Sequence, residues 1–386
     1  MGIEKSVAHY ATLMISRRGR VVLIFILTTV LFMVVLHQFS GSQTLNAVYS
    51  DIEGSLGLFG KDAGKKADGN VDWSRFAYVQ YVTDSEYVCN SVMMFERLHH
   101  LGSRADRVLM YPAKMLWDPA ASDGGGSHDA DLLIKARNEY NVKLVQIRVQ
   151  QKDTDEETWA KSYTKFLAFN QTQYDRVLSL DSDMTILKHM DELFLLPSAR
   201  VAMPRAYWLL ADDPPKRLLS SQVMLVQPST AELERIEKEV KSAGRNDYDM
   251  DILNKLYLGS AIVLPHRPYN MLSSEFRMKE HHNYLGNKDE KWNPVAAFDE
   301  AKCVHFSDFP VPKPWVKADD EGWQHKEKMQ PECKMRGDKE DCTERKMWNN
   351  LYADFRERQG IICAKKPRPK LTDVEAIRPA KTDGHV

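Results

Sequence analysis

The sequence has little of several features that mark specialised protein classes. Only five of its 386 residues are cysteine, and glycine and proline contribute 19 and 17. These contents exclude a small disulfide scaffold and a collagen-like chain. With 43% hydrophobic and 28% charged residues, the chain is also too apolar to be disordered throughout, and it is long enough to bury a core. The composition is that of a globular protein.

The sequence also lacks an excess of positive charge. Its 53 Lys and Arg residues face 54 Asp and Glu residues, which leaves a net charge of -1. Binding to a nucleic-acid backbone requires clustered cations, so generic nucleic-acid binding is disfavoured. The balance is uneven, because residues 1–20 contain four cations and one Glu, a local charge of +3. The rest of the chain must then sum to -4.

Long hydrophobic runs are absent except for one, residues 21–36, which has no charged residue and continues into residues 37–39. As a helix rising ~1.5 Å per residue, it would span roughly 24 to 28 Å, which suits a thin bilayer. A cleaved signal peptide and a buried core helix are the alternatives. Cleavage is disfavoured because no small-x-small site closely follows a short apolar core, although Ser40 to Ser42 leaves this open. We expect an uncleaved transmembrane anchor over residues 21–39.

The charges on either side of this run predict its orientation. Cations precede it, and none follows until Lys61. The positive-inside rule then places residues 1–20 in the cytosol as a tail and the remainder in the lumen. The short span favours the early secretory pathway over the plasma membrane.

The remainder divides by composition. Residues 40–72 are rich in Gly, Ser, Asp and Lys and predict a solvated stem. From Trp73 onwards, strand-like and helix-like segments alternate, which predicts βαβ units and a largely parallel sheet covered on both faces. Ligands of such sheets bind beyond the carboxyl ends of the strands. The expected strands are 75–83, 107–111, 142–149 and 176–180, and the expected helices are 91–101, 130–140 and 158–169.

The C-terminal part differs again. Beyond about residue 319 the chain is charged and Lys-rich, and a Pro and Lys tail predicts disorder. Between them, residues 348–358 have aromatic and Leu side chains at helical spacing, so we expect a helix that packs back on the core.

The five cysteines are an odd number for a luminal protein. We interpret Cys89, which lies among apolar residues, as a buried free thiol. An oxidising lumen would allow one or two disulfides among the other four, with the pairing left open. Zinc is disfavoured, because no two of these four have the spacing of a structural zinc motif. The four are Cys303, Cys333, Cys342 and Cys363.

One N-glycosylation sequon is present, Asn170-Gln171-Thr172. It precedes an expected core strand, so the sequence leaves open whether a glycan fits there.

The pair Asp181 and Asp183 is the first candidate for a functional site. The pattern Asp-x-Asp occurs five times, so its spacing alone decides nothing. Asp181 and Asp183 differ from the others because they directly follow the apolar strand expected at 176–180. Buried charge is costly unless it is paired or binds a metal. The pair predicts an oxygen-ligand site for Mn²⁺ or Mg²⁺, with a solvated strand-end turn as the alternative.

A histidine ends a second short apolar strand. His305 follows Cys303 and Val304, and Lys313 comes eight residues later. A neutral imidazole could supply a nitrogen ligand to the same ion, and the lysine could meet an anion that the ion holds. A satisfied core histidine is the alternative.

A series of segments in this order resembles glycosyltransferase family 8, the glycogenin-like retaining glycosyltransferases. The resemblance covers about residues 75–315. The anchor, the luminal cysteines and the His-Phe-Ser-Asp-x-Pro-x-Pro-Lys-Pro-Trp segment most resemble the fungal Golgi N-acetylglucosaminyltransferases of this superfamily. The segments are YTKF at 163–166, QYDRVL at 173–178, DSD at 181–183, VMLVQPS at 223–229, DMDILN at 249–254, HF at 305–306 and KPW at 313–315.

The resemblance implies a GT-A type nucleotide-diphospho-sugar transferase fold, a Rossmann-like mixed α/β sheet flanked by helices, with an N-terminal transmembrane helix. It places the catalytic domain at 73–318, and the composition beyond it predicts a cysteine-containing extension at 319–365 and a disordered tail at 366–386. It also implies a UDP-sugar donor, a divalent metal (Mn²⁺ or Mg²⁺) on its diphosphate, and a single-pass type II protein of the Golgi membrane.

The resemblance assigns the metal and the diphosphate to particular residues. Asp181 and Asp183 bind the metal, with Asp181 also near the ribose or sugar, and His305 is the third protein ligand. Lys313 stabilises the departing diphosphate. Stabilisation of that charge by a metal and a lysine needs no proton transfer.

The rest of the donor is assigned in the same way. Val82, Thr83 and Tyr87 match positions that hold the uracil and ribose, with an ordinary strand end as the alternative. Lys165 matches a lysine near the donor sugar and phosphates, with a solvated helix lysine as the alternative.

The catalytic acids of the family match Asp249 and Asp251, which would contact the donor sugar and the reacting carbon. Met250 stands between them where many members have Gln, which disfavours glycogenin-like glucosyl transfer. Residues 220–222 are Ser-Ser-Gln where the family often has Asn-Ser-Gly, so Gln222 would fill space near the donor pocket and indicates a different sugar or acceptor. An insertion puts Asp308 where relatives use Gly to approach the phosphate, so the register of Lys313 is open.

These features together predict an enzyme that transfers a sugar, N-acetylglucosamine from UDP-GlcNAc, to a glycan acceptor that contains mannose, with retention of configuration. A glucosyl- or galactosyltransferase of the glycogenin or galactinol-synthase type is one alternative. A catalytically inactive glycan-binding scaffold is the other, and the presence of both aspartates, His305 and Lys313 disfavours it.

Overall fold

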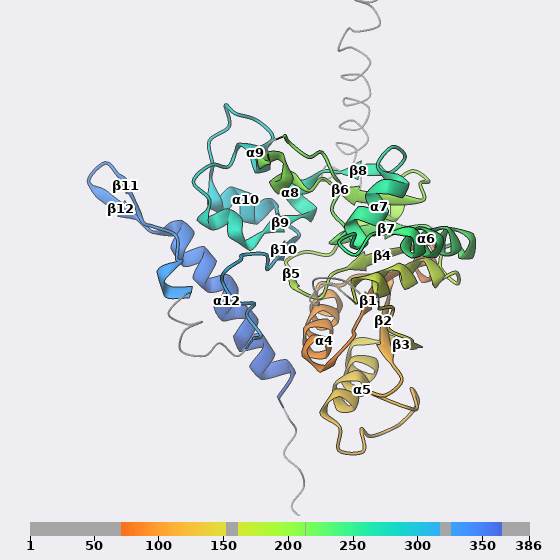
Figure 1. Ribbon diagram of the computed structural model, residues 1–386. Coiled ribbons are helices and arrows are strands. Elements are labelled where there is room, and N and C mark those ends of the chain that lie inside the picture. Colours follow the sequence, from red (N-terminus) through yellow and green to blue (C-terminus); the bar gives the residue numbers. More distant parts are fainter. Residues whose placement is uncertain (1–70, 152–160, 213, 317–325, 365–386) are drawn as a thin grey trace, which may run out of the picture. The chain divides into compact units, whose positions relative to one another are not determined.

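The computed structural model describes residues 71–151, 161–212, 214–316 and 326–364 (Figure 1). The chain divides into two units, Met1–Asp72 and Trp73–Val386, and the second carries the fold described below. The expected cytosolic tail, membrane anchor and C-terminal tail, and nearly all of the stem, lie outside the described residues. Among the helices within the described residues, none has the length and apolar character needed to cross a membrane.

The centre of the second unit is a mixed sheet with strand order β3-β2-β1-β4-β7-β6-β8. Neighbours from β3 to β4 are parallel, whereas β7 runs antiparallel to both β4 and β6. The four strands expected from the sequence all form, and the expected α/β class with a parallel-rich sheet is confirmed. The bounds are β1 (Phe76–Tyr81), β2 (Asp106–Pro112), β3 (Val142–Ile147), β4 (Arg176–Leu180), β6 (Val201–Pro204), β7 (Val223–Val226) and β8 (Ile262–Leu264).

Both faces of this sheet are buried, because alternate side chains of β1 pack into two different cores. Tyr78 packs into a core that includes side chains of α4 and α5, whereas Ala77 and Val79 pack into a second core with side chains of α6 and α7. Successive strand residues point to opposite faces, so a strand buried on both faces needs an unbroken apolar run. The covering helices are α4 (Ser85–His100), α5 (His128–Tyr140), α6 (Thr230–Ser242) and α7 (Asp249–Tyr257) (Figure 1).

Two helix predictions need correction. The helix expected at 91–101 begins six residues earlier, at Ser85, directly after β1. The segment expected as an α-helix at 158–169 is instead the 3₁₀ helix η4 (Ser162–Asn170) in its described part. Aromatic and β-branched residues give η4 a low α-helix propensity. The Thr164 hydroxyl donates to the carbonyl of Gln150, which lies outside η4.

A smaller sheet joins distant parts of the chain beside the main one. Its order is β5-β10-β9, with β10 antiparallel to β5 and parallel to β9. Its strands are β5 (Met184–Ile186), β9 (Met271–Leu272) and β10 (Cys303–His305). The remaining elements before residue 316 are η2 (Trp73–Arg75), η5 (Asp191–Leu195), η6 (Tyr207–Ala211), α8 (His266–Tyr269), η7 (Ser273–Arg277), α9 (His282–Leu285) and α10 (Pro294–Glu300).

The C-terminal extension forms a hairpin and a long helix. The hairpin pairs β11 (Lys334–Arg336) with β12 (Lys339–Asp341), and α12 (Thr343–Ile362) follows. The helix expected at 348–358 is thus confirmed and is longer than expected. Its buried side chains include Trp348 and Tyr352, which join the core that contains α4.

The disulfides correct one cysteine prediction and confirm another. Cys89 is not a free thiol, because it is bonded to Cys363 over a sequence separation of 274 residues. Two cysteines so far apart in the sequence meet only in the folded chain, so their spacing in the sequence cannot predict the disulfide. Cys333 and Cys342 form the disulfide expected among the C-terminal cysteines, and Cys303 is a buried free thiol.

Candidate active site

The acidic pair lies in the connection between β4 and β5. Leu180 ends β4, and the Asp181 amide then donates to the Gln222 carbonyl at 3.0 Å. β5 begins at Met184, which pairs in register with His305 of β10. This pairing brings His305 to the acidic pair. Ligand atoms of Asp181, Asp183 and His305 all lie within 4.8 Å of one another.

Asp183 contacts both His305 and Lys313 through its carboxylate. Its Oδ1 lies 2.7 Å from Nε2 of His305, and its Oδ2 lies 2.8 Å from Nζ of Lys313. Burial works to raise the pKa of Asp183, but the neighbouring His305 and Lys313 outweigh it and hold the pKa well below its usual range. Asp183 is therefore an ionised carboxylate, and Lys313 reaches it despite the insertion in its loop.

Lys165 forms a second, deeper cluster. Its side chain is buried, with Nζ 2.9 Å from Oδ1 of Asp181 and 2.7 Å from Oδ2 of Asp249. Burial works to lower the pKa of Lys165, but the two carboxylates raise it well above the ordinary value. Lys165 is thus a charged residue held inside the protein, and the alternative of a solvated lysine is wrong.

Ser221 completes this cluster, a position to which the sequence assigned no role. Its hydroxyl donates to Oδ2 of Asp249 at 2.7 Å and lies 3.2 Å from Nζ of Lys165. Burial works to raise the pKa of Asp249, but Lys165 lowers it, so Asp249 is also ionised. The only sequence signal for Ser221 is its place before Gln222, which differs from the family pattern.

Two buried polar atoms fit a divalent cation. Oδ1 of Asp181 lacks a hydrogen-bond partner, since the contact of Lys165 with Asp181 does not have hydrogen-bond geometry, and Nε2 of His305 faces the Asp183 carboxylate. Burial raises the pKa of Asp181 to about 6, and the nearby charge of Asp183 adds to this effect. A cation would satisfy these atoms and neutralise the carboxylates. Two carboxylates and an imidazole suit Mn²⁺ or Mg²⁺.

Asp251 has a different environment from Asp249. Both lie in the first turn of α7, where Oδ2 of Asp251 accepts a hydrogen bond from the Tyr248 amide at 3.0 Å. This contact gives the Tyr248 amide at the start of the helix a hydrogen-bond acceptor. Asp249 is therefore brought to Lys165, whereas Asp251 caps α7, and a catalytic role for either residue stays a prediction.

The three predicted nucleotide contacts follow β1. Val82 is fully buried, and the Thr83 hydroxyl donates to Asp84 at 3.0 Å. Burial, followed by the charge of Asp183, raises the pKa of Tyr87 to about 12. β1 and β4 are parallel neighbours, so their carboxyl ends share one edge of the sheet. Tyr87 thus lies within the electrostatic reach of the acidic pair.

Asp308 has partners that the sequence did not reveal. Its carboxylate is buried and accepts hydrogen bonds from Arg277 and Trp348, both at 2.6 Å, and its expected place near a phosphate stays a prediction. Trp348 lies 40 residues further along the chain, in α12. No local sequence pattern indicates such a partner.

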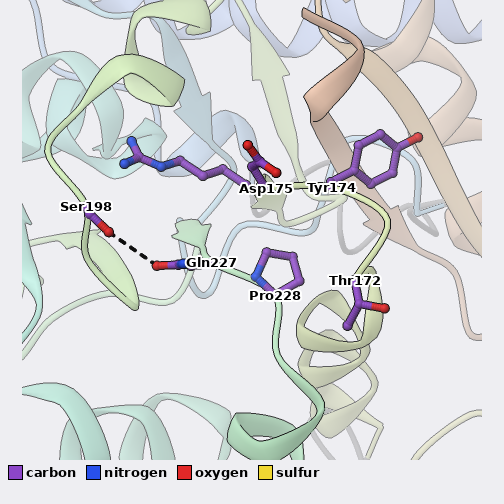
Figure 2. A pocket seen from close by; sticks show the side chains of 7 residues that line it. Thr172, Tyr174, Asp175, Ser198, Gln227 and Pro228 are labelled. Carbon is purple, nitrogen blue, oxygen red and sulfur yellow. Dashed lines mark hydrogen bonds between the residues drawn. The ribbon is translucent and has the colours of Figure 1, made fainter. Parts of the chain in front are cut away.

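A surface hollow of about 490 Å³ lies at the opposite end of β4 from Asp181 (Figure 2). Ser198 and Gln227 meet across it at 3.5 Å. It is separate from the acidic site, since Arg176 begins β4 and Asp181 follows its end. Its lining residues are Thr172, Tyr174, Asp175, Arg176, Ser198, Gln227 and Pro228.

Comparison with known proteins identifies close relatives. No protein-family model matches the chain. It is 57% identical over 293 residues to a Gibberella zeae protein named glucose N-acetyltransferase 1, an alignment that covers 76% of this chain and 63% of that protein. The Aspergillus fumigatus protein of the same name is 44% identical over 313 residues, with 76% of this chain and 78% of that protein covered. Thus the chain spans less than two thirds of the Gibberella relative.

Among solved structures, the apo form of the bifunctional glycosyltransferase WbbM aligns with a TM-score of 0.46 and 16% identity. The alignment covers 77% of this chain and 50% of that one.

Proposed function

This chain belongs to the family of fungal proteins named glucose N-acetyltransferase 1, and on that premise we propose that it is a metal-dependent UDP-sugar glycosyltransferase. The observation that carries the proposal is the convergence of Asp181, Asp183 and His305, with Lys313 beside them. We take the fold to be of the GT-A type, which the parallel-rich sheet and the acidic pair at the end of β4 support.

The acidic site suits a nucleoside diphosphate. Asp181, Asp183 and His305 would hold a divalent cation, which would bind the diphosphate and stabilise its growing negative charge as it leaves. The ammonium of Lys313 lies at Oδ2 of Asp183, the oxygen that His305 does not contact, and would bind the phosphates directly. The uracil and ribose would lie at Val82, Thr83 and Tyr87, beyond the end of β1.

The buried Lys165 cluster suits the donor sugar. Lys165 and Ser221 fix the carboxylate of Asp249 in one orientation, so it can accept hydrogen bonds from sugar hydroxyls without reorganising. Lys165, Asp249 and Ser221 are buried, so a donor sugar bound against them would be shielded from water, which would favour transfer over hydrolysis. We propose that the acceptor hydroxyl attacks the anomeric carbon on the face from which the diphosphate departs. The bond from that carbon to the diphosphate oxygen breaks as the bond to the acceptor oxygen forms, and the departing diphosphate takes the hydroxyl proton, so the configuration is retained.

The donor that we propose is UDP-GlcNAc, and the acceptor is a mannose-containing glycan. The name of the relatives, read literally, describes acetyl transfer to glucose instead. The cation-binding residues favour sugar transfer, because a diphosphate leaving group needs charge stabilisation that a metal and a lysine supply. Glucosyl or galactosyl transfer and an inactive scaffold remain the other candidates.

The test uses the purified full chain with UDP-GlcNAc, UDP-glucose and UDP-galactose, each with and without Mn²⁺ and a mannose acceptor. We expect Mn²⁺-dependent UDP release that is fastest with UDP-GlcNAc, and an α-linked product by NMR. Acetyl-CoA with glucose serves as a parallel reaction, in which released CoA would support the literal activity of the name. Absence of both UDP binding and UDP release would refute the enzyme proposal.

We further propose a type II orientation in the Golgi membrane, with a cytosolic tail, an anchor, a stem and a luminal catalytic domain over residues 73–318. The charge asymmetry around residues 21–36 supports this orientation. The disulfides at Cys89–Cys363 and Cys333–Cys342 support an oxidising compartment.

A further inference from the structure

The segment 306–315, named here the lysine loop, contacts Asp183 both at its first residue and near its last. The Phe306 amide donates to the Asp183 carbonyl at 2.9 Å, and Nζ of Lys313 lies 2.8 Å from the Asp183 carboxylate. Lys313 also donates to the Phe306 carbonyl. The loop therefore directly follows His305 and places Lys313 at the candidate cation site.

The middle of the lysine loop is anchored by a buried charge. The residue Asp308 is 4% exposed. Its Oδ1 accepts from Nε of Arg277 at 2.6 Å, and its Oδ2 accepts from Nε1 of Trp348 at 2.6 Å and from the Tyr352 hydroxyl at 3.3 Å. A buried carboxylate is tolerated only with such partners, so these contacts hold the loop in one position.

The helix α12 also contacts both ends of the lysine loop. At the start, the ring of Phe306 lies 5.2 Å from that of Phe355. At the end, Phe355 contacts Trp315 at 5.6 Å, and Nε of Arg356 donates to the Pro314 carbonyl at 3.1 Å. The helix therefore holds the loop at its beginning, middle and end.

The other side of α12 is fixed to α4. Cys363 is bonded to Cys89, and Arg358 donates to the Met93 carbonyl at 3.0 Å and to Glu96 at 2.7 Å. α4 follows directly from β1 of the central sheet. Thus α12 connects the lysine loop to the helix that follows the first strand of the central sheet.

We propose that Asp308 and α12 position the lysine loop for binding of the donor diphosphate, which makes the C-terminal extension a working part of the active site. This inference rests on the proposed function. Asp308, Trp348 and Tyr352 would touch neither donor nor metal, and they act through Lys313 and His305. Loss of the anchor should therefore weaken binding of donor and metal more than it slows turnover.

The test compares Asp308→Asn with Asp191→Asn in the full chain. Asp191 is a matched control, because it is 1% exposed and accepts from the Tyr78 hydroxyl at 2.8 Å and the Arg104 amide at 2.9 Å, outside the lysine loop. Both substitutions should lower the melting temperature. Only Asp308→Asn should raise the donor KM and the Mn²⁺ concentration for half-maximal activity, each about tenfold, with a smaller change in kcat.

Trp348→Phe provides a second variant if Asp308→Asn does not fold, since it removes the indole donor and keeps an aromatic ring. It should shift KM and the Mn²⁺ requirement in the same direction by a smaller factor. The inference is overturned if the folded variants match Asp191→Asn in donor KM and Mn²⁺ requirement while the unmodified chain is active. An unmodified chain that neither binds nor turns over UDP-sugars overturns the proposed function itself, and this inference with it.

Discussion

Nζ of Lys313 lies 2.8 Å from Oδ2 of Asp183, although 130 residues separate them in the chain. On the other oxygen of the same carboxylate, Nε2 of His305 lies 2.7 Å away. Asp183 is therefore the point where β5, β10 and the lysine loop meet. A cation bound at Asp183 would share this carboxylate with the lysine that we expect to bind the phosphates.

Replacing Asp183 with Ala should abolish Mn²⁺-dependent UDP binding and leave the fold intact. The substitution removes an ionised ligand, whereas Asp175→Asn, at an exposed position, provides a control that should bind UDP normally. Calorimetric titration with UDP and Mn²⁺ measures the loss, and circular dichroism checks the fold. An unchanged affinity would contradict the assignment of Asp183 as a metal ligand.

Replacing Lys313 with Met should have opposite effects on nucleotide and metal. UDP affinity in the presence of Mn²⁺ should fall about tenfold, or ~1.4 kcal/mol, because a charged phosphate contact is lost. Affinity for Mn²⁺ alone should stay the same or rise, because the ammonium that pairs with Asp183 is gone. Both affinities can be measured by calorimetry, and parallel losses would show that Lys313 serves only to hold the loop.

Replacing Lys165 with Met should destabilise the domain by roughly 3–5 kcal/mol, because Asp181 and Asp249 then remain buried without their cation. Adding Asp249→Asn should recover part of this free energy of unfolding, since one uncompensated charge is removed. Urea denaturation of the two single variants and the double variant measures the coupling. Simple additivity of the two losses would contradict a direct ion pair.

The strands and the acidic site could be predicted because their signals are local. The apolar run at 176–180 predicts a buried strand, and Asp181 and Asp183 follow it directly. Because buried charge is costly unless it is paired or binds a metal, the two carboxylates predict a site. His305 could be proposed for the same site from its place at a strand end, but its distance from the pair could not, because the register of β10 against β5 brings it there. The roles of Ser221 and Asp308 depend on partners from other segments, such as Asp249 and Trp348, and no local pattern contains that information.

Cysteine titration should find no reactive thiol in the native chain and one after unfolding without reductant. Two disulfides use four of the five cysteines and leave Cys303, which is 1% exposed. Burial raises the pKa of Cys303 to about 12, so the native thiol should stay unreactive even at pH 9, where a free cysteine is largely ionised. Three thiols after unfolding would contradict one of the disulfides.

Asn170 should carry an N-linked glycan when the full chain is expressed in a fungal cell. Asn170 is exposed at the end of η4, and Thr172 of the sequon is exposed beside the hollow of Figure 2. The core strand β4 begins only at Arg176, so its burial does not block the asparagine. Because N-glycosylation occurs only in the lumen, the glycan also tests the proposed orientation.

Endoglycosidase should increase the electrophoretic mobility of the unmodified chain and of Asn138→Gln, which lies outside a sequon, but not that of Asn170→Gln. Equal mobility of the unmodified chain before and after digestion would contradict a glycan at Asn170 and remove this support for a luminal domain.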